Sequence, residues 1–180
     1  MNQIIIGVVG NKNTGKSTFI SKCSKLLTQL GYKVAIIKFS HSRFTHDPQN
    51  KDTLLFRDSK AEKFIFTSPY EQVRYQKVQE RKIGSEIFLE VGKDVDIVFC
   101  ESYPNNQENI PLIFTISDYK DYLEIRKRYK DQKPIFITGI LHKISKNSLD
   151  NIPVLKIDLI NHQHEITKKI LTIRALNSDF

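Results

Sequence analysis

The sequence predicts one α/β domain in which helices cover both faces of a doubly wound, mostly parallel β-sheet, giving three layers. Its strand candidates are continuous aliphatic runs, which are typical of strands buried on both faces. These runs alternate with segments of helical periodicity, and a glycine-containing loop joins the first strand to the first helix. No linker or internal repeat interrupts the 180 residues, so residues 1–180 are expected to form a single domain.

The first 40 residues predict a βαβ unit. Residues 4–9 are a run of aliphatic side chains, and residues 34–39 form a second run. Between them, helical spacing begins at Lys16, and Gly31 is of the residue type that commonly ends helices. The crossover between the two strands is expected to be right-handed. The apolar stripe expected on this helix comprises Phe19, Ile20, Cys23, Leu26, Leu27 and Leu30.

The middle of the chain predicts a short β-hairpin inserted into this pattern. Residues 41–52 are polar and are expected to form a loop, followed by a short helix at residues 53–60 with Asp52 at its N-cap. Residues 63–67 and 72–78 favour two strands that are separated by a Ser-Pro-Tyr turn.

The rest of the chain continues the alternation of helices and strands. A helix is expected at residues 83–91, and the strand at residues 96–100 leads directly into Glu101. Further strands are expected at residues 112–116, 135–140 and 154–157, and further helices at residues 119–129 and 164–176.

The net charge of +8 and the isoelectric point near 9.4 raise the question of nucleic-acid binding. The basic residues, however, are spread along the chain and mixed with acidic ones. The densest cluster, residues 126–130, is accompanied by Asp121 and Glu124 on an expected helix. This favours a solvated helix face, with docking of an acidic partner or of phosphates as the second interpretation. No helix-turn-helix or RNA-reading aromatic motif is present in the sequence. We therefore expect no nucleic-acid partner.

The chain is expected to be cytoplasmic and not bound to a membrane. No stretch approaches the roughly 18 apolar residues of a membrane helix, and the apolar start lacks the basic region of a signal peptide. Cys23 and Cys100 are then expected to be unpaired and buried.

A phosphate-binding loop is predicted between the first strand and the first helix, where the chain reads Gly-Asn-Lys-Asn-Thr-Gly-Lys-Ser. In the pattern G-x-x-x-x-G-K-[ST], the glycines let backbone N–H groups point at an anion, and the helix dipole adds positive potential. A fortuitous glycine turn is a small residual alternative. The nucleotide-binding residues predicted from this pattern are Gly10, Asn11, Lys12, Asn13, Thr14, Gly15, Lys16, Ser17 and Thr18.

Two side chains of this loop are expected to take part in the chemistry. Lys16 is expected to reach the β- and γ-phosphates and to act in catalysis, and the Ser17 hydroxyl to ligate Mg²⁺. Lys12 is not the signature lysine of partitioning ATPases, which directly follows the first glycine, because Asn11 occupies that place. Lys12 is expected to be an exposed residue of the loop.

Glu101 is the predicted acidic partner of the loop. It follows four buried residues at the carboxyl end of a strand, where ligands bind in such sheets. There it would ligate Mg²⁺ through water or orient an attacking water molecule, which gives it a catalytic and a metal-binding role. Asp94 and Asp96 lie at the other end of that strand and are expected to be structural.

The loop after the second strand is a further candidate wall of the site. Lys38, Ser40, His41 and Asp47 are expected to emerge on the phosphate side. Asp47 is a third candidate Mg²⁺ ligand, although a turn-forming aspartate before proline is nearly as good an interpretation. A lone surface histidine such as His41 predicts no role by itself.

Several ordered blocks resemble the MobB family of molybdopterin-guanine dinucleotide biosynthesis adaptor proteins. They are residues 8–18, residues 31–38 with the following Ser-His, residues 47–53, and residues 96–103. Arg57 and Ala61 also match positions of the family pattern. The blocks cover about the first two-thirds of the chain, and the Lys-Asp-Thr and Glu-Ser-Tyr blocks in this order are specific.

The chain departs from the family pattern at five positions. Asn50, Lys60 and Ser102 stand where glycine is usual, Phe39 where histidine is usual, and Pro104 where lysine is usual. The loss of a glycine matters where the backbone needs a conformation that other residues avoid.

The resemblance implies a homodimeric GTP-binding protein with slow GTPase activity. Such a protein assists the molybdenum cofactor guanylyltransferase, which attaches GMP to molybdopterin, and it uses GTP and Mg²⁺. The guanine preference comes from the resemblance alone, because the chain has no Asn-Lys-x-Asp base-reading motif.

Two other functions fit the same loop. A small-molecule kinase would carry an arginine-bearing lid, for which residues 74–82 are the candidate segment, although their alternation favours a hairpin. A basic nucleic-acid-associated ATPase is the third and weakest interpretation, because the positive charge is scattered.

Overall fold

The computed structural model describes residues 3–40, 63–67, 69–70, 72–76, 85–91, 94–105 and 109–176. The chain divides into two compact units, one formed by Met1–Phe39 with Gly84–Phe180 and the other by Ser40–Ile83. The predicted phosphate-binding loop and Glu101 both belong to the first unit.

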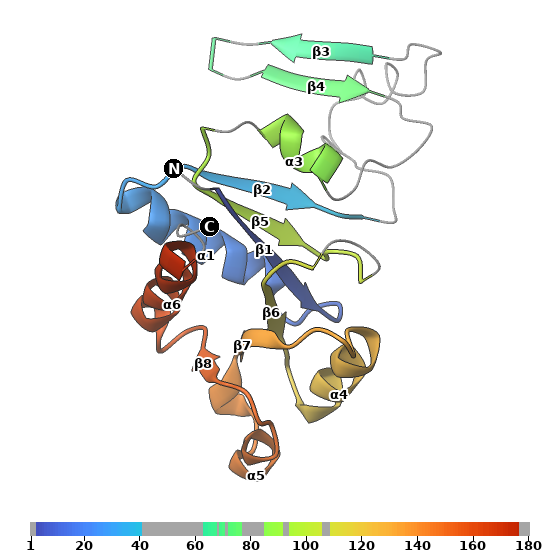
Figure 1. Ribbon diagram of the computed structural model, residues 1–180, viewed down its shortest axis with the longest axis vertical. Helices are drawn as coiled ribbons and strands as arrows, with labels where there is room; N and C mark the ends of the chain where they lie inside the picture. Colours follow the sequence, from blue (N-terminus) through green and yellow to red (C-terminus); the bar gives the residue numbers. More distant parts are fainter. Residues whose placement is uncertain are drawn as a thin grey trace. The chain divides into compact units, whose positions relative to one another are not determined.

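The first unit is built on a six-stranded sheet with the strand order β2-β5-β1-β6-β7-β8 (Figure 1). Each neighbouring pair of strands is parallel, which confirms the predicted mostly parallel sheet. The strands are β1 (Ile4–Gly10), β2 (Val34–Lys38), β5 (Ile97–Glu101), β6 (Leu112–Thr115), β7 (Pro134–Gly139) and β8 (Lys156–Asp158).

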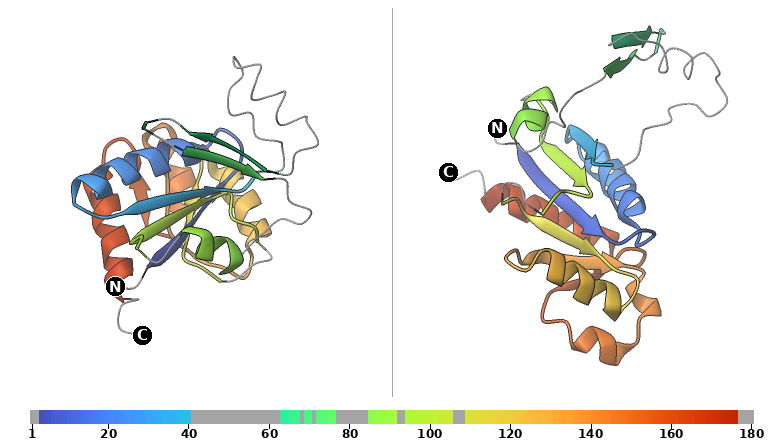
Figure 2. Two further views of the ribbon diagram at one scale, coloured as in Figure 1. Left: turned by 90° about the horizontal axis from the view of Figure 1, so that it is seen from above. Right: turned by 90° about the vertical axis from the view of Figure 1, so that its right-hand side faces the viewer.

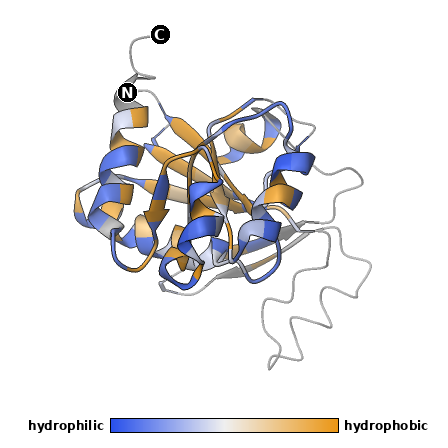
Figure 3. Cartoon of the chain, turned by 90° about the horizontal axis from the view of Figure 1, so that it is seen from below, coloured by the Kyte–Doolittle hydropathy of each residue, from blue (hydrophilic) through white to orange (hydrophobic). Residues whose placement is uncertain are grey.

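Helices cover both faces of this sheet, as expected for three layers (Figure 2). On one face lie α1 (Lys16–Gln29) and α6 (Gln163–Leu176), and on the other lie α3 (Ser85–Val91) and α4 (Tyr119–Arg128). Burial of apolar surface between the layers contributes roughly 25 cal/mol per Å². Figure 3 shows hydrophobic strands between helices whose polar residues alternate with apolar ones. The core beneath α1 and α6 includes Ile4, Ile6, Val8, Phe19, Ile20, Cys23, Leu27, Ile97, Phe99, Ile113, Phe136, Ile157, Leu159, Ile166 and Ile170.

Aromatic side chains fill the opposite face. Phe39 and Phe88 both contact Tyr103, with ring centroids 5.7 and 6.4 Å apart, and Phe114 contacts Tyr129 at 6.0 Å. The Tyr129 hydroxyl donates to the Tyr103 carbonyl oxygen at 2.5 Å, so the buried phenol has a partner. Burial raises the pKa of Tyr129 despite the positive charge of nearby Arg128.

The strand order predicts a ligand site at the carboxyl end of β1. Strand β1 lies between β5 and β6, and the sheet continues to β2 on one side and to β7 and β8 on the other. Ligands bind in such sheets where the strand order reverses, outside the carboxyl ends of the strands. The predicted phosphate loop starts at that end of β1.

Helix α1 ends before Gly31, as the sequence predicted, but one residue of the expected stripe differs. Gly31 has a φ of 88°, its N–H donates to the Thr28 carbonyl oxygen, and the Tyr32 N–H donates to Leu27. These bonds satisfy carbonyl groups at the helix end. Leu30, expected in the apolar stripe of this helix, is instead its C-cap, and its side chain is 60 % exposed.

The second unit contains the predicted hairpin. Strands β3 (Lys63–Thr67) and β4 (Gln72–Gln76) pair antiparallel, with Lys63 opposite Gln76 and Thr67 opposite Gln72. The loop expected at residues 41–52 and the helix expected at residues 53–60 lie outside the described residues.

Two short elements near the C-terminus were not predicted. A 3₁₀ turn, η1 (Leu141–Lys143), follows β7, and the short helix α5 (Lys146–Asp150) begins after Ser145, whose hydroxyl accepts from the Ser148 N–H. Strand β8 begins two residues later than expected and ends at Asp158. Such short elements lack the periodic stripe that identifies longer ones. Among the described residues, no helix is both long and apolar enough to cross a membrane.

Candidate functional site

The two glycines of the phosphate loop are required for different reasons. Gly15, immediately before α1, has a φ of 90°, a conformation that side-chain-bearing residues avoid. A Cβ added at Gly10 would instead lie 2.2 Å from Thr115 Oγ1 and 2.5 Å from the Thr115 carbonyl oxygen. Gly10 is therefore needed for close packing of the loop against β6.

Hydroxyl groups fasten the loop to the neighbouring strand. Thr14 Oγ1 donates to the Asn11 carbonyl oxygen at 2.9 Å and lies 2.7 Å from Thr115 Oγ1, at the end of β6. Both threonines are buried, so these bonds have little competition from water. Sequence reasoning missed Thr115. The available signal was a polar residue at the carboxyl end of a strand, but its neighbour depends on the strand order.

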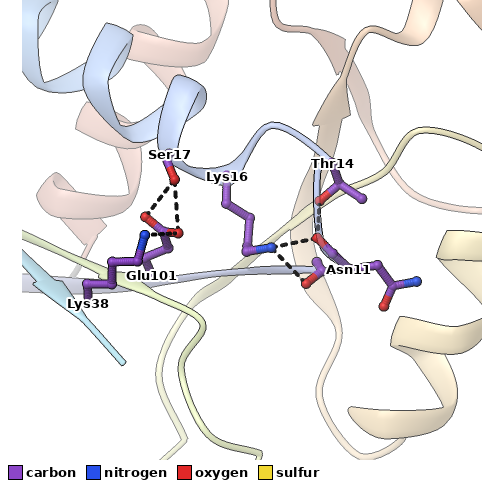
Figure 4. Close-up of polar contacts among 7 residues, drawn as sticks. Asn11, Thr14, Lys16, Ser17, Lys38 and Glu101 are labelled. Carbon is purple, nitrogen blue, oxygen red and sulfur yellow. Dashed lines mark hydrogen bonds and ion pairs between the residues drawn. The ribbon is translucent and has the colours of Figure 1, made fainter. Parts of the chain in front are cut away.

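Lys16 folds back into the loop. Its Nζ donates to the carbonyl oxygens of Gly10 at 3.0 Å and Asn11 at 2.6 Å (Figure 4). Burial lowers the pKa of Lys16, and the negative charge of Glu101 opposes that shift. Lys38 and Arg128 lower it further, whereas Asp121 raises it.

Glu101 lies where the sequence placed it, at the end of β5, and its side chain faces the loop. The Ser17 hydroxyl donates to both carboxylate oxygens, each at 3.0 Å, and Lys38 Nζ is 3.2 Å from Oε1 (Figure 4). Glu101 is only 7 % exposed, so its charge needs these partners. Strand register sets the ion pair, because Lys38 and Glu101 are Cα partners across β2 and β5.

A pocket of about 420 Å³ opens beside these groups. Six of the nine predicted nucleotide-binding residues line it, while Gly10, Asn11 and Thr14 support the loop through the contacts above. The lining residues are Lys12, Asn13, Gly15, Lys16, Ser17, Thr18, Lys38 and Glu101.

The residues present fit a magnesium ion that is shared with phosphates. Ser17 and Glu101 are in contact, and hydroxyl and carboxylate oxygens are the donors that Mg²⁺ prefers. Among the described residues, no group of three or more acidic, histidine or cysteine side chains could hold a metal ion by itself. Mg²⁺ commonly takes one or two protein ligands and completes its shell with water and phosphate oxygens. The third predicted ligand, Asp47, lies outside the described residues, as does His41.

The side chain of Asn11 faces away from Lys16, toward helix α4. Its Nδ2 donates to Asp121 Oδ1 at 2.6 Å and Glu124 Oε2 at 2.7 Å, and Arg128 Nη2 donates to its Oδ1 at 3.2 Å. These three residues recur at helical spacing, so one side of α4 contacts the loop. Burial raises the pKa of Asp121, but hydrogen bonds from Ser117, from the Asn11 side chain and from the Asp118 backbone outweigh this and lower it.

The basic cluster on α4 is less uniformly solvated than predicted. Arg126 Nη1 donates to the carbonyl oxygens of Tyr129 at 3.2 Å and Gln132 at 2.5 Å, which caps the helix end. Arg128 contacts Asn11 as described above, whereas Lys127 and Lys130 are exposed. At the far end of β5, Asp96 accepts from the Lys33 N–H at 2.9 Å and Asp94 pairs with the Lys33 side chain, so both are structural as expected.

A second polar cluster lies at the carboxyl end of β8, and the sequence did not indicate it. Asp158 accepts from the backbone N–H groups of His142, Ile160 and Asn161, each within 3.0 Å, and lies 3.0 Å from His142 Nδ1. Burial raises the pKa of Asp158, but these hydrogen bonds outweigh it and hold the pKa at about 2. Asp158 thereby fixes the loops that follow β7 and β8.

The parallel sheet and the loop between β1 and α1 define a P-loop NTPase fold, the class of proteins that bind nucleotide phosphates. Within this class, the family profile of molybdopterin guanine dinucleotide synthesis protein B, MobB, matches residues 5–132. The chain belongs to the MobB family, as the sequence resemblance predicted. Membership implies nucleotide binding in general and supports a role in molybdenum cofactor biosynthesis.

Solved structures agree with this fold. A MobB protein homolog from Bacillus stearothermophilus is 13 % identical with a TM-score of 0.66, and the match covers 96 % of this chain and 98 % of that one. MobB from Bacillus subtilis is 18 % identical with a TM-score of 0.62, covering 94 % and 95 %. At such identities the likeness shows the fold alone. A search of curated proteins found no match.

Proposed function

We propose that this chain is a GTP-binding adaptor with slow GTPase activity that assists the guanylyltransferase step of molybdenum cofactor biosynthesis. The contact of Ser17 with Glu101 beside Lys16, in a member of the MobB family, is the observation that carries the proposal. The choice of GTP over ATP and the guanylyltransferase partner come from the family resemblance.

The residues of the loop provide the binding chemistry. Backbone N–H groups and the start of α1 offer positive potential to the phosphates. The carbonyl oxygens of Gly10 and Asn11 compete with phosphate oxygens for the Lys16 ammonium group, so Lys16 can exchange one set of partners for the other. Ser17 and Glu101 would hold Mg²⁺, which neutralises charge on the phosphates when bound.

The surroundings of Glu101 favour slow hydrolysis. A carboxylate that activates water needs an accessible oxygen atom. Here the Ser17 hydroxyl donates to both oxygens of Glu101, and Lys38 pairs with one of them. For Glu101 to orient a water molecule, one of these existing contacts therefore has to break. We expect turnover far below that of a dedicated phosphotransferase.

A titration of GTP and ATP, each with and without Mg²⁺, tests the proposal. Wild-type protein is expected to bind GTP more tightly than ATP and to need Mg²⁺ for full affinity. Lys16→Ala is expected to weaken GTP binding at least about tenfold, because a charge-assisted hydrogen bond contributes roughly 1.5–3 kcal/mol. Unchanged affinity in Lys16→Ala would refute the proposed site.

The same titration separates the adaptor from a kinase. Preference for ATP, together with rapid phosphate transfer to a metabolite, would favour the kinase. The described part of the candidate lid includes Arg74, which lies on the paired strand β4. Residues 77–82 lie outside the described residues. No observation favours the kinase.

The homodimer and the partner need separate measurements. Light scattering is expected to give twice the mass of the 21.0 kDa chain. Purified guanylyltransferase is expected to bind the protein, and the basic residues Arg126 and Lys127 of α4 and Lys130 just after it are candidates for contacts with an acidic surface. A complex that forms unchanged after charge reversal at these positions would remove α4 from consideration. Cytoplasmic localisation also stays a prediction.

A further inference from the structure

Lys38 is a second lysine that reaches the pocket from another strand. It is the last residue of β2, its side chain is 55 % exposed, and it lines the same pocket as Lys16. Its Nζ lies 3.2 Å from Glu101 Oε1, beside the contact between Ser17 and that carboxylate. Figure 4 shows Lys38 and Lys16 approaching the site from different elements.

More positive side chains line the pocket than are needed to neutralise Glu101. The charged lining residues are three lysines, Lys12, Lys16 and Lys38, and one glutamate. An ammonium group has three donors, and the contact with Glu101 engages one of them. A second anion can therefore share Lys38 with Glu101.

A purely structural role for Lys38 is a weak explanation. Ion pairs in which one partner is well exposed contribute roughly 0–1 kcal/mol to the free energy of folding. Lys38 also lies at the end of its strand rather than within the core. The position of Lys38 is better explained by contact with a ligand that enters the pocket than by a contribution to the stability of the sheet.

We propose that Lys38 is a second phosphate-binding residue, one that contacts the terminal phosphate and so distinguishes a nucleoside triphosphate from a diphosphate. This inference rests on the proposed nucleotide-binding function. The backbone N–H groups of such loops surround the inner phosphates, and Lys16 reaches the β- and γ-phosphates from the loop side. Ser17 and Glu101 mark the metal position, which in such sites adjoins the last two phosphates. Lys38 contacts Glu101 from the β2 side, next to that end of the phosphate chain.

The test compares dissociation constants for a non-hydrolysable GTP analogue and for GDP, with Mg²⁺ present. Lys38→Ala is expected to weaken binding of the analogue by about tenfold to a hundredfold, the effect of one charge-assisted hydrogen bond. Binding of GDP is expected to change less than about threefold. Lys38→Arg should retain much of the discrimination, since it keeps the charge.

Lys33→Ala is the matched control. Lys33 is also an exposed lysine paired with an acid, because its Nζ lies 3.6 Å from Asp94 Oδ2. Lys33→Ala therefore removes the same charge as Lys38→Ala does. Lys33 lies five residues before Lys38, about 16 Å along an extended strand, which exceeds the Debye length of about 8 Å at physiological salt. We expect Lys33→Ala to bind both nucleotides as the wild type does.

A double-mutant cycle with Glu101 separates phosphate binding from a counter-ion role. In the Glu101→Gln background without Mg²⁺, Lys38 has lost its charged partner. If Lys38 only neutralises Glu101, adding Lys38→Ala to this background leaves triphosphate binding unchanged, which overturns the inference. We expect a further loss of about tenfold or more.

The outcomes distinguish this inference from the proposed function. An equal loss of triphosphate and diphosphate affinity in Lys38→Ala overturns the role of Lys38, while GTP binding by the wild type leaves the proposed function standing. Inorganic tripolyphosphate serves as a probe without a base. If wild-type protein binds tripolyphosphate through Lys38 but binds no nucleotide, the proposed function fails and Lys38 keeps its role. If the wild type binds none of these compounds, both fail.

Discussion

Ser102 shows how a single residue positions the acidic end of the site. It directly follows Glu101, has a φ of 59° in the left-handed region, and its N–H donates to the Val8 carbonyl oxygen at 2.9 Å. The family pattern has glycine here, so the chain retains the glycine conformation with a serine. This conformation costs a side-chain-bearing residue roughly 1–2 kcal/mol.

Ser102→Gly is therefore expected to raise the free energy of unfolding by about 0.5–1 kcal/mol, after the greater chain entropy of glycine is allowed for. Urea denaturation measures this change. Ser148→Gly is a control with the opposite expected sign, because Ser148 lies in helix α5. If Ser102→Gly lowers stability as much as Ser148→Gly does, the backbone at residue 102 is not strained.

At the scale of elements, Asp158 connects the ends of β7 and β8. Its hydrogen bonds lower its pKa from the ordinary 3.8 to about 2. Because the folded pKa is below the unfolded one, Asp158 stabilises the fold above about pH 4, and this contribution disappears as the pH falls toward 2. The shift corresponds to about 2 kcal/mol.

Asp158→Asn is expected to lower the free energy of unfolding by about 2 kcal/mol at pH 7. The difference from wild type should shrink as the pH falls from 4 to 2, which denaturation at several pH values would show. Asp94→Asn is the control, since its surface ion pair with Lys33 contributes little. A difference for Asp158→Asn that stays constant with pH would contradict the assignment.

The elements that the sequence predicted are those with an extended physical pattern. The buried strands are aliphatic runs, and α1 carries an apolar stripe of which Phe19, Ile20, Cys23 and Leu27 are buried. The α5 helix has no buried residue, so no apolar pattern could indicate it. Leu30 matched the period, but it lies where the helix has already ended.

The residues of the candidate site also fall into those that a local sequence pattern predicts and those that it does not. Lys16 and Ser17 follow from spacing within one loop, and Glu101 follows from its place at the end of a buried strand. The contacts of Thr115 with Thr14 and of Lys38 with Glu101 depend on which strands are neighbours and in what register. Strand order is a property of the folded sheet, so no local pattern predicts these pairs.

At the scale of the whole molecule, the net charge of +8 needs an explanation that fits the site. Within the described residues, three lysines, Lys12, Lys16 and Lys38, line the phosphate pocket together with a single acid, Glu101. Other basic residues are engaged locally, as Arg126 is at the end of α4. Charge distributed in this way attracts small anions more readily than it forms a track for nucleic acid.

We therefore expect weak DNA binding without a steep salt dependence. A protein that neutralises several phosphates loses affinity with a slope near −0.9 per phosphate in a plot of log K against log salt. Fluorescence anisotropy with a labelled duplex at several salt concentrations measures the slope. A steep slope with tight binding would support the nucleic-acid-associated ATPase instead.

The two cysteines have a practical consequence for such measurements. Cys23 and Cys100 are unpaired, as predicted, at 2 % and 0 % exposed, and burial raises the pKa of each thiol to about 12. At pH 8 only about one thiol in ten thousand is then ionised, so both react slowly with maleimides. A single cysteine introduced at exposed Leu89 would accept a dye selectively while both natural cysteines stay in place. The native core thus provides a ready background for fluorescence studies of this protein.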